Sequence, residues 1–140
     1  MSGKLSGHLS NCSTLMKNLK YLVSGSLDTN VKVWDYRAKN CVTTFKGHND
    51  QITCLDISPD SSIIASGSMD QTVKLWDMRT NKMIKTIQVS STGHPQCMSF
   101  NPRDLCLAVG STDKITRYWE LQEYNLVSQT TIDNSVPQKL

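Results

Sequence analysis

The sequence predicts an all-β fold that repeats one four-stranded antiparallel unit about three times. Three blocks resemble one another: SGSLDTNVKVWD at residues 24–35, SGSMDQTVKLWD at 66–77 and VGSTDKITRYWE at 109–120. Their tryptophans, Trp34, Trp76 and Trp119, stand 42 and 43 positions apart. This period lies within the roughly 40–45 residues expected of repeats that hold four short strands. No stretch has a convincing helical period, so strands and turns are expected throughout.

The second unit shows the four strands most clearly. Apolar and polar residues alternate along Ile52–Ile57, and Ser58-Pro59-Asp60 has the composition of a turn. Further along, Val73 and Leu75 fall on one face of a strand and Lys74 and Trp76 on the other. We therefore expect strands at 52–57, 63–67, 72–77 and 83–89, with polar turns at 58–60, 69–71 and 79–82.

Length and composition are typical of one ordinary globular domain. The chain has 140 residues, is 38% hydrophobic and carries a formal net charge of +3. This charge is too mild to indicate a nucleic-acid partner. The sequence lacks the run of roughly 20 apolar residues that a membrane-spanning helix needs. It also shows no apolar segment of a secretory signal. We therefore expect no membrane association and a cytoplasmic or nuclear location.

The five cysteines, Cys12, Cys41, Cys54, Cys97 and Cys106, have no metal-ligand spacing among themselves or with histidine. They are interpreted as reduced thiols, and no metal or cofactor is expected.

Four polar side chains recur in the units and can form one chain of hydrogen bonds. An indole N–H donates to a hydroxyl, the hydroxyl donates to a neutral imidazole, and a carboxylate accepts from the far ring nitrogen. Buried and fully satisfied, such a chain would hold the turns of each unit together. Its expected members are His48, Ser66, Asp70 and Trp76 in the second unit and His8, Ser24, Asp28 and Trp34 in the first.

The third unit departs from this pattern. Asp113 and Trp119 keep their places and are the expected members of the hydrogen-bond network there, but Val109 stands where the second unit has Ser66. Counting back from Trp119 by the spacing of the second unit reaches Ser91, three residues short of His94. Only the second unit has the full set of four.

The same His and Asp residues argue against catalysis by this chain. They recur at one structural place in successive units, whereas a catalytic site needs a single constellation in a cleft with an activated nucleophile or acid. The Ser-Gly-Ser segments lack the GK[ST] sequence and the following helix of a phosphate-binding loop. We therefore expect a non-catalytic protein, with no catalytic residues.

These motifs resemble the Trp-Asp (WD) repeat family of β-propellers, and the blocks that carry the resemblance cover nearly the whole chain. The resemblance implies a propeller with four-stranded antiparallel blades that binds other proteins. We expect the repeat region at residues 1–132, with repeats at about 5–45, 46–88 and 89–132, and a polar C-terminal tail at 133–140.

More narrowly, SGSLDTNVKVWDYRAKNCVTTFKGH, DQTVKLWDMRTNKMIKTI and ITRYWELQEYNLVSQ resemble the non-catalytic regulatory subunit of katanin. This resemblance implies a role in targeting or regulating microtubule severing, with the katanin catalytic ATPase subunit and microtubules as partners. It also implies a location on the cytoskeleton, at microtubules and at the spindle pole or centrosome.

Two departures limit that resemblance. Propellers typically close with about 4–8 blades, and this chain supplies about three, so we expect an open arc. An open arc exposes sheet edges that can pair with another chain, a second arc of the same kind included. The C-terminal helical region by which the family's subunit holds its ATPase is also missing. A truncated repeat product without independent function is therefore a further alternative.

Arg37 and Arg79 each follow the tryptophan of their unit by three positions, in Trp-Asp-Tyr-Arg and Trp-Asp-Met-Arg. A Trp-Asp-x-Arg pair in successive repeats resembles the docking signature of substrate receptors of cullin-RING ubiquitin ligases. The simpler interpretation, which we favour, is a turn arginine paired with a nearby carboxylate, worth about 0–1 kcal/mol at a surface. If the docking interpretation holds instead, Arg37 and Arg79 are the candidate partner-binding residues.

Overall fold

The computed structural model confirms the all-β fold. It describes residues 12–17, 21–35, 37–38, 40–101, 103, 106–122 and 125–131, with only the backbone described for 12–17 and 131. Within these segments no helix is long and apolar enough to cross a membrane. The strands are β1 (Cys12–Lys17), β2 (Tyr21–Ser26), β3 (Val31–Asp35), β4 (Asn40–Phe45), β5 (Ile52–Ile57), β6 (Ile63–Ser68), β7 (Thr72–Asp77), β8 (Lys82–Gln88), β9 (Pro95–Phe100), β10 (Cys106–Ser111), β11 (Ile115–Glu120) and β12 (Asn125–Thr131).

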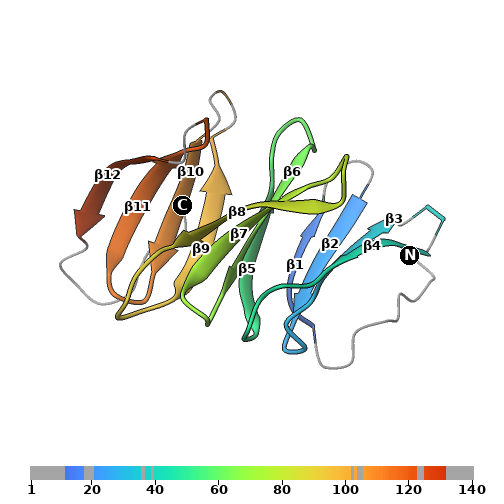
Figure 1. Cartoon of the computed structure of the whole chain (residues 1–140), viewed down its shortest axis with the longest axis horizontal. Helices are drawn as coiled ribbons and strands as arrows, with labels where there is room; N and C mark the ends of the chain where they lie inside the picture. Colours follow the sequence, from blue (N-terminus) through green and yellow to red (C-terminus); the bar gives the residue numbers. More distant parts are fainter. Residues whose placement is uncertain are drawn as a thin grey trace.

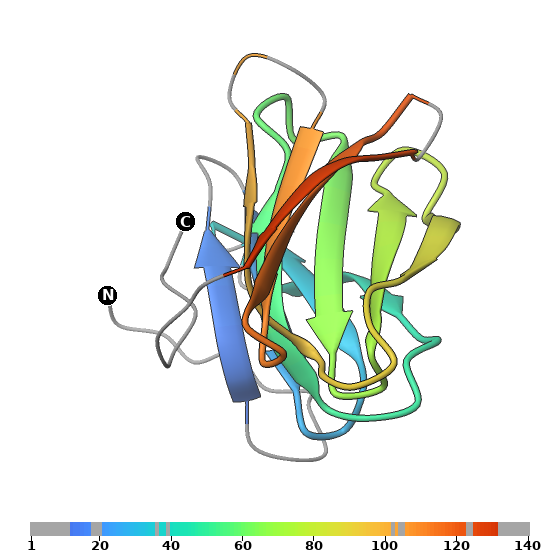
Figure 2. The same ribbon diagram turned by 90° about the vertical axis from the view of Figure 1, so that its left-hand side faces the viewer.

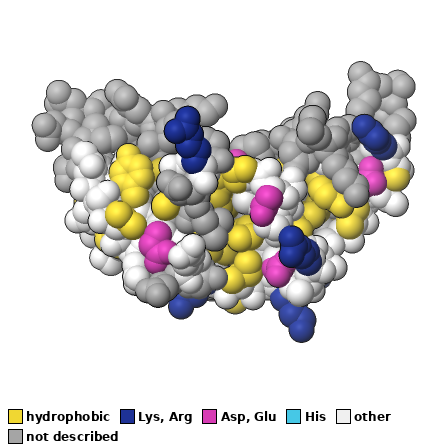
Figure 3. All heavy atoms as spheres, turned by 90° about the horizontal axis from the view of Figure 1, so that it is seen from above, with side chains coloured by type: hydrophobic (Ala, Val, Ile, Leu, Met, Phe, Trp, Pro, Cys, Tyr) yellow, Lys and Arg dark blue, Asp and Glu magenta, His cyan; other side chains and the backbone are white. Residues whose placement is uncertain are grey.

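The strands form three antiparallel sheets, each a simple meander of four consecutive strands. We call them blade 1 (β1–β4), blade 2 (β5–β8) and blade 3 (β9–β12), and they stand side by side in Figure 1. The first strands of neighbouring blades pack against each other, β1 on β5 and β5 on β9. Figure 2 shows β1 at one side of the molecule and β8 at the other. The fold is thus a partial, open propeller with first strands inside and last strands outside. The face seen from above in Figure 3 mixes hydrophobic side chains with acidic and basic ones.

Two apolar cores lie between the blades, because the two faces of blade 2 are both covered. Toward blade 1, the fully buried Ile64 and the ring of Trp76 join a cluster that includes Val33 and Phe45. The rings of Phe45 and Trp76 stack with centroids 4.9 Å apart. Toward blade 3, the second cluster is formed by Cys54, Ala65, Val73, Leu75, Ile87, Val89, Met98, Phe100, Leu107, Val109 and Leu121. The alternation along β7 therefore sends Trp76 to one core and Val73 and Leu75 to the other, as the sequence predicts.

Polar contacts also join blade 2 to blade 3. The Phe100 N–H donates to Oδ2 of Asp56 at 2.7 Å, and the Thr53 hydroxyl donates to the carbonyl oxygen of Pro95 at 2.6 Å. Burial raises the pKa of the Asp56 carboxyl, while hydrogen bonds from the backbone N–H groups of Phe100 and Ile57 oppose that shift. These bonds fix the spacing of the inner strands β5 and β9.

The turn between the second and third strands has the same shape in all three blades. Thr29, Gln71 and Lys114 occupy one equivalent position, with φ values of 71°, 74° and 68°. The aspartate just before each of them accepts a backbone N–H from the residue just after it, at 3.0, 3.0 and 3.1 Å. The aspartate of each repeat therefore shapes its own turn, whatever else it binds.

The four cysteines whose side chains the structure describes are free thiols. Cys54 lies in the core between blades 2 and 3, where burial raises the pKa of its thiol to about 12. It therefore packs as a neutral apolar side chain.

Candidate functional site

In blade 2 the structure brings together the four polar residues expected from the sequence. The Trp76 indole N–H donates to the Ser66 hydroxyl oxygen at 2.8 Å, and that oxygen lies 2.7 Å from Nε2 of His48. On the other side of the ring, Nδ1 of His48 lies 2.9 Å from Oδ2 of Asp70. A neutral imidazole with its proton on Nδ1 satisfies every one of these contacts. This series of hydrogen bonds links strands β6 and β7 to the loop before β5.

The surroundings keep this imidazole neutral. Burial lowers the pKa of His48, and this effect outweighs the hydrogen bond and the charge of Asp70, which raise it. Burial alone would raise the pKa of Asp70, but hydrogen bonds from the Thr72 hydroxyl, the Asn49 N–H and His48 outweigh it and lower that pKa. At neutral pH the pair is therefore a neutral ring held by an ionised carboxylate.

The His48, Asp70 and Ser66 contacts have the distances of a nucleophilic triad, but their setting is structural. Ser66 is completely buried, and its oxygen already accepts the Trp76 N–H. A substrate cannot approach a hydroxyl in that position without opening the blade. Among the described residues, no group of three or more His, Cys, Asp or Glu side chains is placed to hold a metal ion.

Blade 1 contains part of the same arrangement. The Trp34 indole N–H donates to the Ser24 hydroxyl at 2.9 Å, with both side chains buried. Asp28 shapes the β2–β3 turn as Asp70 shapes the β6–β7 turn. His8, the expected fourth member, lies outside the described residues.

In blade 3 the expectation that Trp119 joins such a chain is wrong. Its indole nitrogen is buried and has no hydrogen-bond partner among the described residues, because the apolar Val109 occupies the place of Ser66 and offers no acceptor. Asp113 instead pairs with Arg117, whose Nη2 donates to Oδ2 at 2.9 Å, and accepts hydrogen bonds from Ser90 and Ser111. The carboxylate that meets histidine in blade 2 meets arginine in blade 3.

The presence of arginine where blade 2 has histidine explains the low pKa of Asp113 in blade 3. Partial burial alone would raise the pKa of Asp113, but hydrogen bonds from Arg117, Ser111 and Ser90 outweigh it and hold that pKa well below its usual range. The serine that donates to Asp113 is Ser90, one residue before Ser91, the position to which the repeat spacing points. His94 does not take this place, and its backbone binds Thr112. The ion pair thus replaces the missing imidazole.

Arg117 is the member of the blade 3 hydrogen-bond network that the sequence argument missed. At the same strand position, blades 1 and 2 carry Lys32 and Lys74, whose ammonium groups donate to Thr44 at 2.8 Å and Thr86 at 2.9 Å on the outer strand. Blade 3 pairs Arg117 with Gln129 in that register. The change from lysine and threonine to arginine and glutamine was the available signal.

Arg37 and Arg79 both lie on exposed turns after the third strand of their blades. Each uses its backbone N–H to bind the preceding aspartate, Asp35 at 3.0 Å and Asp77 at 2.8 Å. Neither guanidinium forms an ion pair with a carboxylate of the described segments. The simpler interpretation, a turn arginine paired with a nearby carboxylate, therefore has no such pair to support it within the described segments.

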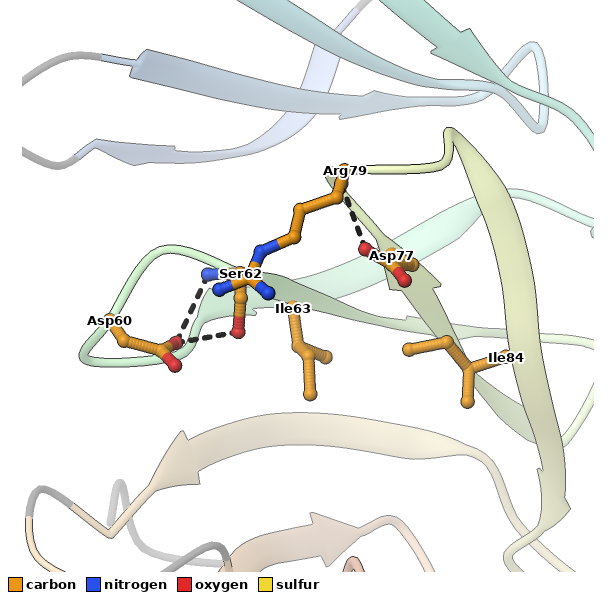
Figure 4. Close-up of a pocket in the computed structure, with 6 residues that line it drawn as sticks. All are labelled: Asp60, Ser62, Ile63, Asp77, Arg79 and Ile84. Carbon is orange, nitrogen blue, oxygen red and sulfur yellow. Dashed lines mark hydrogen bonds between the residues drawn. The ribbon is translucent and has the colours of Figure 1, made fainter.

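Arg79 borders a shallow hollow at the end of blade 2 where the β5–β6 and β7–β8 turns lie (Figure 4). The hollow has a volume of about 280 Å³. Its lining combines two carboxylates, one hydroxyl, one guanidinium and two aliphatic side chains: Asp60, Ser62, Ile63, Asp77, Arg79 and Ile84. It lies at the opposite end of the blade from His48 and Asp70.

Three four-stranded sheets stand side by side, and the Trp–Ser–His–Asp contacts are complete in blade 2 and partly repeated in blade 1. Together these features define an arc of β-propeller blades. The family model described as "WD domain, G-beta repeat" matches residues 1–35, 39–77 and 82–120. The chain therefore belongs to the WD-repeat family.

Relatives and solved structures agree with this assignment. The chain is 56% identical over 36 residues to Cell division control protein 4 of Saccharomyces cerevisiae, covering 26% of this chain and 5% of that protein. It is 39% identical over 49 residues to Protein NEDD1 of Homo sapiens, covering 35% and 7% respectively. The solved structure of U3-55K superposes with a TM-score of 0.88 at 18% identity, over 94% of this chain and 42% of that one. The matched regions thus span less than a tenth of these two relatives and under half of the solved propeller.

Proposed function

We propose that this WD-repeat interaction module is non-catalytic and binds its protein partner through the exposed turns and outer strands of its blades. The observation that supports this proposal is the contrast between the two sets of polar groups. The histidine, serine and aspartate that could do chemistry are buried and engaged within blade 2. The guanidinium groups of Arg37 and Arg79 are exposed and without a carboxylate partner in the described segments.

For the identity of the partner, we propose the microtubule-severing complex, with the katanin catalytic ATPase subunit and microtubules as targets on the cytoskeleton. The sequence resemblance described above is its main support. The outer strand β8 adds a surface of suitable character, since Lys82 and Lys85 flank Met83 and Ile84 and all four are exposed. A basic and apolar strand of this kind suits the acidic surface of tubulin.

Co-sedimentation of the purified full chain with microtubules tests this function, with and without the katanin ATPase subunit. We expect binding that weakens as salt rises, because it depends on exposed charges. The double variant Lys82→Glu/Lys85→Glu should bind less, whereas Arg37→Ala/Arg79→Ala should bind like the parent chain. Binding of neither microtubules nor the ATPase subunit would refute the proposal.

A second candidate function is that of a substrate receptor of a cullin-RING ubiquitin ligase. The observation that favours it is the presence of Arg37 and Arg79 at equivalent turn positions, both exposed and both without an ion pair in the described segments. Here the adaptor propeller of the ligase should bind the parent chain and fail to bind Arg37→Ala/Arg79→Ala. The arginine and lysine double variants thus separate the two functions with the same purified proteins.

A further inference from the structure

The hollow beside Arg79 has a rigid acidic rim. Oδ1 of Asp60 accepts three hydrogen bonds within its own turn, from the hydroxyls of Ser58 and Ser62 at 2.7 Å each and from the Ser62 N–H at 3.0 Å. These bonds lower the pKa of Asp60 to about 2, so it is ionised under all physiological conditions. Across the hollow, Oδ1 of Asp77 accepts the Arg79 N–H at 2.8 Å. Both carboxylates are therefore held in place by hydrogen bonds from neighbouring residues before any partner arrives.

One oxygen of each carboxylate remains available. Within the described segments, the side-chain hydrogen bonds of Asp60 and Asp77 all end on Oδ1, and neither residue has an ion pair with a cation. The guanidinium of Arg79 extends over the hollow toward Ser62 in Figure 4 but lies beyond ion-pair distance of both carboxylates. Two fixed negative charges thus stand beside one long and exposed positive side chain.

The floor of the hollow is aliphatic. Ile63 and Ile84 lie side by side beneath the charged rim in Figure 4, and Ile84 is 38% exposed. Lysine and arginine carry an aliphatic stem below a charged head, and they cover apolar surface with the stem while the head stays hydrated. The volume of about 280 Å³ lies just below the roughly 300–1,000 Å³ of pockets for drug-sized ligands. The hollow therefore suits one side chain of a protein better than a cofactor.

We propose that the hollow receives a lysine or arginine side chain of the protein partner. The stem of that side chain rests on Ile63 and Ile84, and its cationic head lies between the free oxygens of Asp60 and Asp77. Arg79 moves outward and is free to pair with an acidic residue of the same partner segment. This inference rests on the proposed function in one respect, that the chain binds proteins through its exposed turns.

Titration of the isotope-labelled full chain, followed by nuclear magnetic resonance, tests the inference with blocked tripeptides as probes. The probes are acetyl-Ala-Arg-Ala-amide, the norleucine analogue with an uncharged side chain of similar length, and the glutamate analogue. We expect saturable shifts of the Ile63 and Ile84 methyl signals with the arginine probe alone. The double variant Asp60→Asn/Asp77→Asn should weaken that binding by about fivefold or more, the scale expected of exposed ion pairs.

The asparagine variants keep the Oδ1 acceptors, so the turns should remain folded, which an unchanged melting transition verifies. Asp50→Asn is the matched control, since Asp50 is an exposed carboxylate that precedes β5, at the opposite end from Asp60. Arg79→Ala should bind the arginine probe at least as tightly as the parent chain, because a competing cation is removed. Equal binding of the norleucine probe, preferential binding of the glutamate probe or unchanged affinity in the double asparagine variant would each overturn the proposal. Because these probes contain neither tubulin nor ATPase, such a failure is distinguishable from failure of the proposed function.

Discussion

The Nδ1 atom of His48 lies 2.9 Å from Oδ2 of Asp70, with the side chains 0% and 9% exposed. The other ring nitrogen faces the Ser66 hydroxyl, which receives the Trp76 N–H. A second proton on the ring would turn Nε2 into a donor toward Ser66. The hydroxyl would then have to turn its own proton elsewhere. The folded state therefore prefers the neutral ring.

Stability should for this reason fall in mild acid. The pKa of His48 is lowered below its ordinary value of 6.5, so the unfolded chain binds more protons just below that pH. The free energy of unfolding contributed by the neutral ring is complete above pH 6.5, declines as pH falls through this value, and levels off below the folded-state pKa. Urea unfolding at a series of pH values measures the decline.

His48→Gln is the matched variant for that experiment, since it removes the His48 imidazole and no other titratable group. It should be less stable at neutral pH by about 1–3 kcal/mol, the cost of buried groups left unpaired. Its stability should change less than that of the parent chain between about pH 7.5 and 5.5. A parent chain and variant with parallel pH profiles would contradict the assignment of the effect to His48.

The tryptophans of blades 2 and 3 should respond differently to the same substitution. Trp76→Phe removes the donor to Ser66, whereas Trp119→Phe removes an indole nitrogen that has no partner in the part of the chain that the structure describes. Both changes lose aromatic surface, and Trp76 loses more because its ring is the more deeply buried. The difference therefore reports the hydrogen bond together with this extra packing. We expect Trp76→Phe to cost about 1–3 kcal/mol more than Trp119→Phe in urea unfolding followed by circular dichroism. Equal losses would show that the Trp76–Ser66 bond adds nothing to stability.

Gly67 of blade 2 lies in close contact with Pro95 of blade 3. A Cβ atom there would stand 2.6 Å from Sγ of Cys54 and 2.8 Å from Cβ of Pro95. Gly67→Ala should therefore push the blades apart and destabilise the chain by about 1–3 kcal/mol. Gly47→Ala is the control, because its Cβ would meet only the ring of Trp76, at 3.1 Å, and the lysine stem beyond it. If both variants melt at the same temperature, the close approach at Gly67 does not constrain the packing.

Thr29 offers a route to a more stable chain. It is a β-branched residue with φ at 71°, in the left-handed region where a Cβ atom is strained. Thr29→Gly should remove this strain and raise the free energy of unfolding by up to about 1 kcal/mol, after the loss of backbone entropy in glycine is counted. Thr29→Ala keeps a Cβ atom and should gain less. A glycine variant less stable than the alanine variant would contradict this account.

Much of blade 2 could be predicted from the sequence because its residues follow the repeat pattern closely. The alternation in β5 and β7 identified which faces are apolar, and the spacing of His48, Ser66, Asp70 and Trp76 placed them in one chain of contacts. Such periodic signals depend only on local strand geometry, which the sequence carries directly.

The repeat pattern could not predict the ion pair of blade 3 or the hollow at the end of blade 2. A pattern can reveal that Val109 replaces a serine, but not that a guanidinium from Arg117 then reaches Asp113. The hollow likewise forms because Asp60, in the turn before β6, and Asp77, at the end of β7, lie at the same end of these paired strands. Contacts of this kind depend on side-chain conformations in three dimensions, and no spacing rule describes them.

The bond from the Phe100 N–H to Asp56 makes the blades unequal as building blocks. By the strand registers, Met16 of β1 and Ser99 of β9 hold the position that Asp56 holds in β5. Neither the thioether of methionine nor the short hydroxyl of serine can supply a carboxylate to the next blade. Blade 2 is therefore joined to blade 3 by a hydrogen bond for which blades 1 and 3 lack the carboxylate at this position. An engineer who shuffled or duplicated these repeats would preserve the fold of each sheet but lose this joint wherever blade 2 no longer precedes blade 3.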